Sequence, residues 1–170
     1  MYGEKSTSVS IWGIRTRLQM SSNVRDLAMF NLAIDSKLRA CDLTRLQVQD
    51  ISVGGHVVSW ATFMQQKTRR PVQFEITEQT LHSVAAWISA RGLKPVDYLF
   101  PSRLRASPHL STRQYARNVH RWVASIGLHD AAYGTHTMRR TKASLIYRRT
   151  KNLRAVQLLL AHTKLESTVR

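Results

Sequence analysis

Acidic residues are scarce in this 170-residue sequence. Ten Asp and Glu residues stand against 26 Lys and Arg residues, so the formal net charge is +16. The seven histidines and ten carboxylates show no metal-ligand spacing of the H-x-x-x-H or D-x-D kind. A Mg²⁺ or Zn²⁺ site needs several such ligands close together. The shortage therefore argues against a metal-dependent nuclease, and we expect no cofactor.

Cysteine and long apolar runs are also scarce. The one cysteine, Cys41, has no partner for an internal disulfide, which favours a reducing cytoplasmic setting. Cys41 lies in an apolar pattern and is interpreted as a core residue. No run of about 18 apolar residues is present, as a membrane-spanning helix would need. Residues 1–10 lack the apolar stretch of a signal peptide.

Positive charge is abundant in the sequence, and the chain also has enough hydrophobic residues to fold. Hydrophobic residues make up 43% of the sequence, which is enough for the core of one domain. A folded domain with this charge imbalance repels itself unless it meets a polyanion. Nucleic acid is the leading partner. An incidentally basic or ribosomal-type protein and an anionic membrane surface remain alternatives, although no separate basic amphipathic helix is evident.

Apolar periodicity and capping residues predict mostly helices. Ser22 or Asn23 is suited to cap a largely buried helix, and Thr77 is suited to begin an amphipathic helix that ends near Gly92. Ser111 or Thr112 marks a further start, and Thr135 marks another. The expected helical segments are residues 12–20, 24–34, 38–46, 77–91, 112–126, 135–149 and 153–160, with another beginning at residues 166–170.

The segment between residues 50 and 76 has a different pattern. It is rich in β-branched and aromatic residues, with Gly54 and Gly55 suited to a hairpin turn. A second turn at residues 67–70 leads to a strand over residues 71–76. We expect a small three-stranded antiparallel sheet in a mainly helical domain, an α+β fold. Residues 1–20 are expected as a lead-in segment, loose over residues 1–10.

One cluster of residue types suits chemistry on a phosphodiester. Cleavage without a metal needs fixed cations around the phosphate, a general acid for the leaving oxygen and a base for the nucleophile. Arginine is always charged and can bind two oxygens at once. His136 and Arg139 lie three residues apart at an expected helix start, which suits a phosphate site. This spacing is common by chance and has little weight alone.

Five segments, taken in order, resemble the motifs of the tyrosine recombinase (phage integrase) family. Each is weak to moderate alone, but their order and spacing match the family across nearly the whole chain. The resemblance identifies residues 21–170 as the catalytic domain, of the DNA breaking-rejoining enzyme type. The segments are 38–43 (LRACDL), 66–72 (QKTRRPV), 97–102 (DYLFPS), 135–139 (THTMR) and 159–168 (LLAHTKLEST).

The resemblance implies a role for each matched residue. Arg39 and Arg139 would clamp the scissile phosphate, and Lys67 would protonate the leaving oxygen. His136 would take part in proton transfer, and His162 would donate a hydrogen bond to a non-bridging oxygen. The supporting residues would be Asp42, which buttresses an arginine or histidine, and Arg69, Arg70 and Arg140, which contact DNA.

The sequence departs from the family in two places. Ala161 stands where the family usually has glycine, and Arg140 stands where the family often has histidine. The nucleophilic tyrosine is expected nine residues after His162, directly after Arg170, where this sequence stops. We therefore expect no covalent 3′-phosphotyrosine link from these residues alone. The family further implies double-stranded DNA as partner, a tetramer on DNA for the complete protein and a monomer for this domain in isolation.

Three other functions stay open at this level. A DNA- or RNA-binding module, or a remnant of the enzyme, could keep the fold without catalysis. A type IB topoisomerase-like enzyme shares the chemistry, although the length and the LFPS element argue against it. A metal-dependent nuclease would lose activity with a chelator.

Overall fold

Helices make up most of the fold. The computed structural model describes residues 4–129, 131 and 133–154. Its helices are α1 (Glu4–Met20), α2 (Val24–Ser36), α3 (Ala40–Leu43), α4 (Val48–Ile51), α5 (Glu78–Arg91), α6 (Thr112–Ala124) and α7 (Thr135–Thr150). The strands are β1 (Ser52–Val53), β2 (His56–Val57), β3 (Trp60–Met64) and β4 (Pro71–Glu75). The α+β class expected from the sequence is confirmed.

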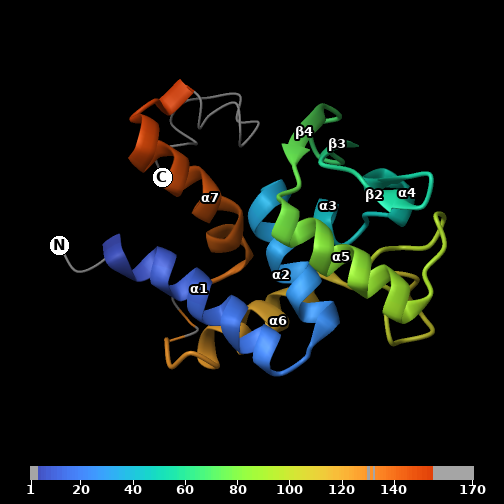
Figure 1. The fold of residues 1–170 in the computed structure, drawn as a ribbon, viewed down its shortest axis with the longest axis horizontal. Coiled ribbons are helices and arrows are strands. Elements are labelled where there is room, and N and C mark those ends of the chain that lie inside the picture. Colours follow the sequence, from blue (N-terminus) through green and yellow to red (C-terminus); the bar gives the residue numbers. More distant parts are fainter. Residues whose placement is uncertain (1–3, 130, 132, 155–170) are drawn as a thin grey trace.

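Helix α2 lies at the centre and contacts α1, α5, α7 and β4 (Figure 1). Asn23 caps it as predicted, because its side-chain oxygen accepts a hydrogen bond from the Asp26 backbone N–H at 3.1 Å. Phe30 of α2 is fully buried and meets Trp122 of α6 edge to face, with ring centroids 5.6 Å apart. Helix α2 is thus held on several sides, so its two ends are fixed points in the fold.

Residues 4–20 form one helix, and Ile14 and Leu18 are buried in the core. The helix expected over residues 12–20 is confirmed. The prediction of a loose lead-in is wrong for residues 4–10, because they continue the same helix, whose residues Ile11, Ile14 and Leu18 recur at helical spacing and form an apolar stripe. The expected domain boundary at residue 20 coincides with the end of α1 and stays a prediction.

Buried polar side chains join α1, α2 and α5. Arg15 Nε donates to Asn31 Oδ1 at 2.8 Å, and Asn31 Nδ2 donates to Ser83 Oγ at 3.1 Å. At the other end of α2, Asp35 Oδ2 accepts bonds from the backbone N–H and the hydroxyl of Thr77, at 2.9 and 2.7 Å. Because buried polar groups are costly unless paired, these bonds hold the three helices in register.

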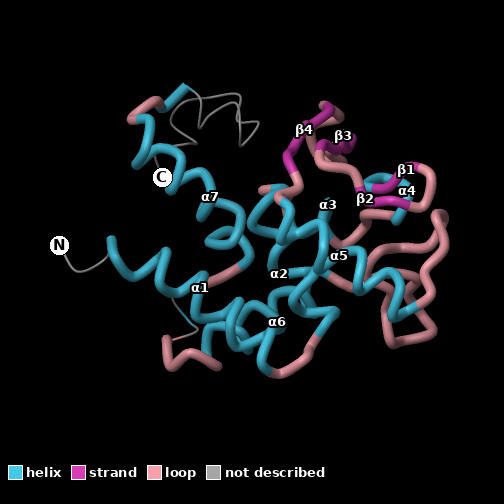
Figure 2. Tube along the Cα trace, in the orientation of Figure 1, coloured by secondary structure: helices cyan, strands magenta, loops and turns pink. Residues whose placement is uncertain are grey.

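The β structure is two ladders rather than one three-stranded sheet. β1 pairs with β2 and β3 pairs with β4, both antiparallel (Figure 2). The chain leaves the strand conformation at Val58 and Ser59, which divides the expected second strand into β2 and β3. The expected strand over residues 71–76 is confirmed in its alternation, since Val72, Phe74 and Ile76 are buried.

The helix expected over residues 38–46 is shorter than predicted. It covers Ala40–Leu43, and the chain then turns so that the Leu46 carbonyl accepts a bond from the Leu99 N–H at 2.7 Å. Val48 N–H likewise bonds to the Asp97 carbonyl at 3.0 Å, within the segment expected to be extended. The apolar pattern of residues 38–46 is real, but backbone pairing with residues 97–99 competes with the helix.

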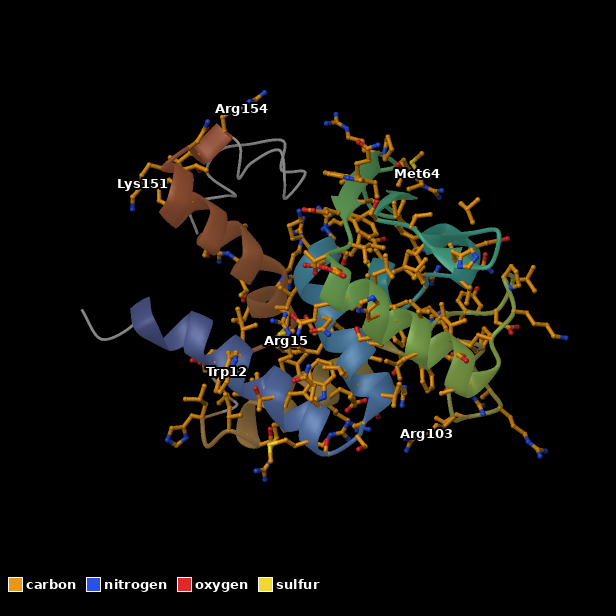
Figure 3. The ribbon with its side chains drawn as sticks, viewed as in Figure 1. Trp12, Arg15, Met64, Arg103, Lys151 and Arg154 are labelled. Atoms are coloured by element: carbon orange, nitrogen blue, oxygen red, sulfur yellow. The ribbon has the colours of Figure 1, made fainter. Side chains whose placement is uncertain are left out.

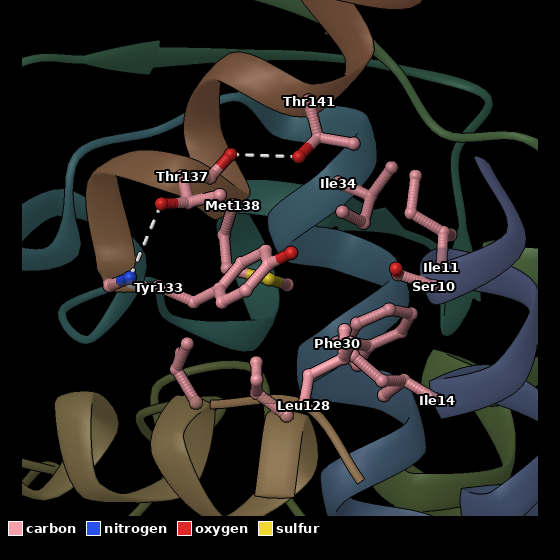
Figure 4. Close-up of a pocket in the computed structure, with 13 residues that line it drawn as sticks. Ser10, Ile11, Ile14, Phe30, Ile34, Leu128, Tyr133, Thr137, Met138 and Thr141 are labelled. Carbon is pink, nitrogen blue, oxygen red and sulfur yellow. Dashed lines mark hydrogen bonds between the residues drawn. The ribbon is translucent and has the colours of Figure 1, made fainter. Parts of the chain in front are cut away.

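Helix α7 meets the core through Met138. Met138 is buried and lines a small apolar hollow of about 30 Å³ between α1, α2, α6 and α7, together with Ile14, Phe30 and Ile34 (Figure 4). Successive helical residues are about 100° apart, so the next residue, Arg139, leaves this hollow in a different direction. Among the described residues no helix is long and apolar enough to span a membrane. The helices expected over 153–160 and from 166 lie largely or wholly outside the described residues.

Candidate active site

Arg39 lies three residues beyond the end of α2, directly before the first residue of α3. Its backbone is extended there, with φ −65° and ψ 155°. Its half-buried side chain is held by Gln65, because Nη1 donates to Gln65 Oε1 at 2.9 Å. Arginine has five donors in a fixed plane, so this bond orients the guanidinium and leaves other donors for a ligand.

Arg139 reaches the same place from α7, one hundred residues later in the chain. Its side chain is buried, and Nε donates to the carbonyl oxygen of Lys37 at 2.9 Å. Lys37 ends α2 in the left-handed conformation, with φ 56°. The end of α2 therefore positions both arginines, Arg39 through the chain and Arg139 through a backbone carbonyl.

The charges of the two arginines interact. Burial, the larger cause, and the nearby charge of Arg39 lower the pKa of Arg139 to about 10, and Asp42 partly opposes both. Arg139 is still protonated at neutral pH. Two like charges held together in a partly dry pocket favour an anion between them, because an anion would relieve both the desolvation and the repulsion.

Asp42 is the buried carboxylate of this pocket. Its side chain is fully buried, and Oδ1 accepts a bond from the Gln66 backbone N–H at 3.0 Å. Oδ2 has no hydrogen-bond partner among the described residues. Asp42 thus ties the α3 segment to the β3–β4 turn and supplies negative charge beside Arg139.

Gln65 is a site residue that sequence reasoning missed. It is 1% exposed, and its Oε1 accepts from both Arg39 Nη1 and Thr68 Oγ1, each at 2.9 Å. Its backbone closes the β3–β4 turn, since Arg69 N–H donates to the Gln65 carbonyl at 3.0 Å. No periodicity marks Gln65, because its partner Arg39 is 26 residues away.

The other predicted site residues lie around this pair. Lys67 is exposed in the β3–β4 turn, two residues beyond Gln65. His136 is exposed in the first turn of α7, three residues before Arg139. The structure thus places Arg39 and Asp42 near enough to Arg139 for their charges to act on it, and connects the turn of Lys67 to Arg39 through Gln65. Arg69, Arg70 and Arg140 are exposed, and His162 and Ala161 lie outside the described residues.

The described tyrosines have other surroundings. Tyr115 is buried in the core, and burial raises its pKa, which makes it a poor nucleophile. Tyr98 packs against the His109 ring with centroids 4.9 Å apart. Tyr147 packs against Ala143, and Lys151 Nζ lies 5.6 Å from its ring centroid. Tyr133 lines the apolar hollow beside α7.

A second basic feature was not predicted. The loop after α5 and the first turns of α6 form a groove of about 520 Å³. No acidic residue is among those that line it, within the part of the chain that is described. Figure 3 shows Arg103 of this groove on the side of the molecule away from Met64 of the β3–β4 hairpin. We call this surface the arginine groove, and its basic residues are Arg25, Arg103, Arg113, Arg117 and Arg121.

The groove residue Arg25 has unmet hydrogen-bonding capacity. Its Nε and Nη2 are buried without a partner among the described residues. Burial lowers its pKa, Asp26 opposes this, and Arg103 and Arg121 add to the lowering. Asp26 is already engaged, since Oδ2 accepts from Arg121 Nη2 at 2.6 Å and Trp122 Nε1 at 2.9 Å. The groove therefore carries an excess of positive charge.

Metal ligands do not gather in this structure. Over residues 4–129, 131 and 133–154, no three His, Cys, Asp or Glu side chains are placed to hold a metal ion. Cys41, expected in the core, is half-buried beside the arginine pair.

Known proteins resemble this chain over most of its length. An integrase/recombinase described as probable, YoeC of Bacillus subtilis (strain 168), is 32% identical over 151 residues, which cover 89% of this chain and 78% of YoeC. A tyrosine recombinase of Pseudothermotoga lettingae is 32% identical over 146 residues, covering 86% of this chain and 48% of that protein. The chain thus spans about half of the second relative.

A solved structure shares the fold. The XerH site-specific recombinase, bound to its difH substrate in a pre-cleavage complex, superposes with a TM-score of 0.74 over 94% of this chain and 47% of XerH, at 18% identity. The sequence profile of the phage integrase family matches residues 13–170. With that match spanning both arginines and the hairpin between them, the chain belongs to the phage integrase family.

Proposed function

We propose that this chain is the catalytic domain of a site-specific DNA recombinase that breaks and rejoins DNA through a 3′-phosphotyrosine intermediate in the complete protein. The observation that carries the proposal is that Arg139 is bonded to the Lys37 carbonyl, two residues before Arg39, where the charge of Arg39 lowers the pKa of Arg139. Residues 100 positions apart are held together at an energetic cost that an anion would offset. A DNA phosphate between the two guanidinium groups meets this need.

The reaction assigns one role to each residue. The tyrosine oxygen attacks phosphorus, and the bond from phosphorus to the 5′ oxygen breaks. Arg39 and Arg139 stabilise the extra negative charge on the non-bridging oxygens, with His162 as a further donor. Lys67 delivers a proton to the departing 5′ oxygen, and His136 accepts the tyrosine proton. Rejoining reverses these steps. The mechanism needs no metal, because the arginines stabilise the negative charge and Lys67 and His136 transfer the protons.

The arginine groove is proposed to hold the backbone of the bound duplex. Its lining carries five arginines and no carboxylate among the described residues. Phosphate contacts supply most of the salt-dependent affinity of such surfaces. The complete protein is proposed to act as a tetramer on double-stranded DNA in the cytoplasm, and this domain to be a monomer by itself.

The central test is covalent capture on DNA. The chain with a tyrosine added directly after Arg170 is mixed with a nicked suicide duplex, chosen from a randomised pool by binding to the chain. We expect a covalent adduct that survives denaturing electrophoresis and forms equally well in the presence of a chelator. The chain ending at Arg170 serves as control and should form none. An adduct lost on chelation, or one formed by the control, contradicts the assignment.

The groove makes a separate prediction about affinity. Arg113→Ala should weaken DNA binding about five- to tenfold at moderate salt and reduce the slope of log affinity against log salt by about one, because one phosphate contact is lost. Arg17→Ala, which removes an exposed arginine of α1 outside the groove, is the matched control. Binding is measured by fluorescence anisotropy across a salt series. Equal losses in the two variants would mean that general charge, not the groove, binds the DNA.

A further inference from the structure

Gln65 connects Arg39 with the turn that carries Lys67. In the proposed reaction these two parts of the site act on different atoms of the substrate. Arg39 acts on the non-bridging oxygens of the phosphate, and Lys67 acts on the leaving oxygen. The Gln65 side-chain oxygen accepts a bond from Arg39 on one side and from the Thr68 hydroxyl on the other, each at 2.9 Å. Thr68 directly follows Lys67, so one buried oxygen holds both the phosphate clamp and the turn that carries the proposed acid.

The backbone adds to this connection. Gln65 N–H donates to the Arg70 carbonyl, and Arg69 N–H donates to the Gln65 carbonyl, both at 3.0 Å. Arg69 is in the left-handed conformation, with φ 52°. Such a residue costs energy unless its surroundings hold it. The turn therefore depends on the bonds at Gln65 for its shape.

The burial of Gln65 makes the connection stiff. With the residue 1% exposed, water cannot readily replace Arg39 or Thr68 as a partner of its oxygen. If either donor is lost, the Gln65 oxygen keeps one hydrogen bond instead of two. The remaining bond then becomes more important, because it alone pairs the buried oxygen. Asp42 Oδ1, bonded to the Gln66 N–H at 3.0 Å, is a second tie between the turn and the arginine pocket.

We propose that Gln65 is a positioning residue that couples phosphate binding at Arg39 and Arg139 to the ordering of the Lys67 turn. When a phosphate fixes the Arg39 guanidinium, its Nη1 bond to Gln65 is fixed too, and Gln65 then holds Thr68 and the turn. The catalytic acid is thereby ordered when substrate is present. By linkage, a loosened turn weakens phosphate binding. The inference rests on the proposed function, because it needs a phosphate at the arginine pair.

The coupling is tested on the 170-residue chain with inorganic phosphate as the probe. Hydrogen exchange is followed at the Gln66 and Arg69 amides, and phosphate affinity is taken from the shift in unfolding temperature. We expect phosphate to slow exchange at both amides severalfold. In Gln65→Met, which keeps the volume and removes the acceptor, phosphate affinity should fall about tenfold and the added protection should vanish. Gln66→Met, at an exposed neighbour, should behave as the parent chain.

Thr68 supplies a second pair of variants in case Gln65→Met does not fold. Thr68→Val keeps the shape and removes the hydroxyl, and Thr68→Ser restores it. The valine variant should lose the phosphate-induced protection and bind phosphate a few times more weakly, and the serine variant should recover both. A residue with a merely structural role would not show this recovery in a ligand-dependent signal.

The possible failures are distinguishable. If phosphate binding is the same in Arg39→Ala as in the parent chain, the arginine pair is not a phosphate site and the proposed function fails with it. If binding depends on Arg39 but phosphate protects the turn equally in Gln65→Met, the proposed function stands and the coupling is refuted. Phosphate bound at Arg39 with unchanged exchange in the parent chain refutes the coupling as well.

Discussion

Replacing Arg139 by alanine is expected to slow covalent adduct formation about 10²–10³-fold, in the chain that carries a tyrosine directly after Arg170. The transition state places more negative charge on the non-bridging oxygens than the bound phosphate does. A cation in a partly dry pocket stabilises that added charge far more strongly than an exposed one. Arg139 is buried and fixed by the Lys37 carbonyl, so it needs no reorganisation as the charge develops.

The same substitution should affect DNA binding far less. Many phosphate contacts contribute to affinity, and the arginine groove stays intact, so we expect a loss of less than about tenfold. Arg140→Ala is the matched control, since Arg140 is exposed beside Arg139 in the sequence. It should reduce adduct formation by no more than a few fold. A non-catalytic binding module predicts the reverse, with both variants altering affinity alone. Pre-steady-state adduct formation and anisotropy separate these outcomes.

Replacing Asp42 by alanine is expected to destabilise the fold by about 3 kcal/mol, because it removes one partner from a buried charge cluster. The Gln66 N–H loses its acceptor, and the repulsion between Arg39 and Arg139 is no longer opposed. For a chain of this size the loss corresponds to a fall in unfolding temperature of about 6–12 °C. Thermal unfolding followed by circular dichroism measures it.

A matched variant separates the two contributions of Asp42. Asp42→Asn keeps an oxygen for the Gln66 N–H and removes the charge, so its unfolding temperature should lie between those of the parent and the alanine variant. Added phosphate should recover part of the loss in both, because a bound anion replaces the missing negative charge. An alanine variant as stable as the parent would show that Asp42 does not balance the arginine pair.

Features set by neighbouring residues were predictable from the sequence. The caps at Asn23 and Ser111 depend on a side chain and a backbone group three residues away, so the pattern marks them directly. Gly92 ends α5 with φ 67°, a conformation that glycine adopts readily. The order of the five motif segments, and hence the family, is likewise written along the chain.

Long-range pairing decided the rest. Periodicity marked residues 38–46 as helical, but backbone bonds to residues 97–99 shortened the helix. The break at Val58 and Ser59, which divides the β structure into two ladders, is not marked by any glycine or proline at these positions. The arginine groove combines Arg25 with a loop and helix α6, which follow about 80 residues later in the sequence. Its concentration of positive charge arises only when the fold brings these segments together.

The sequence by itself determined which residues are available for chemistry and in what order, because helix caps, strand alternation and motif spacing are short-range properties. Tertiary structure decided which of them meet. Arg139 reaches Arg39 because the end of α2 offers the Lys37 carbonyl and because Met138 anchors α7 on the core. Gln65 likewise lies between Arg39 and Thr68 because of hydrogen bonds that form only when the chain folds.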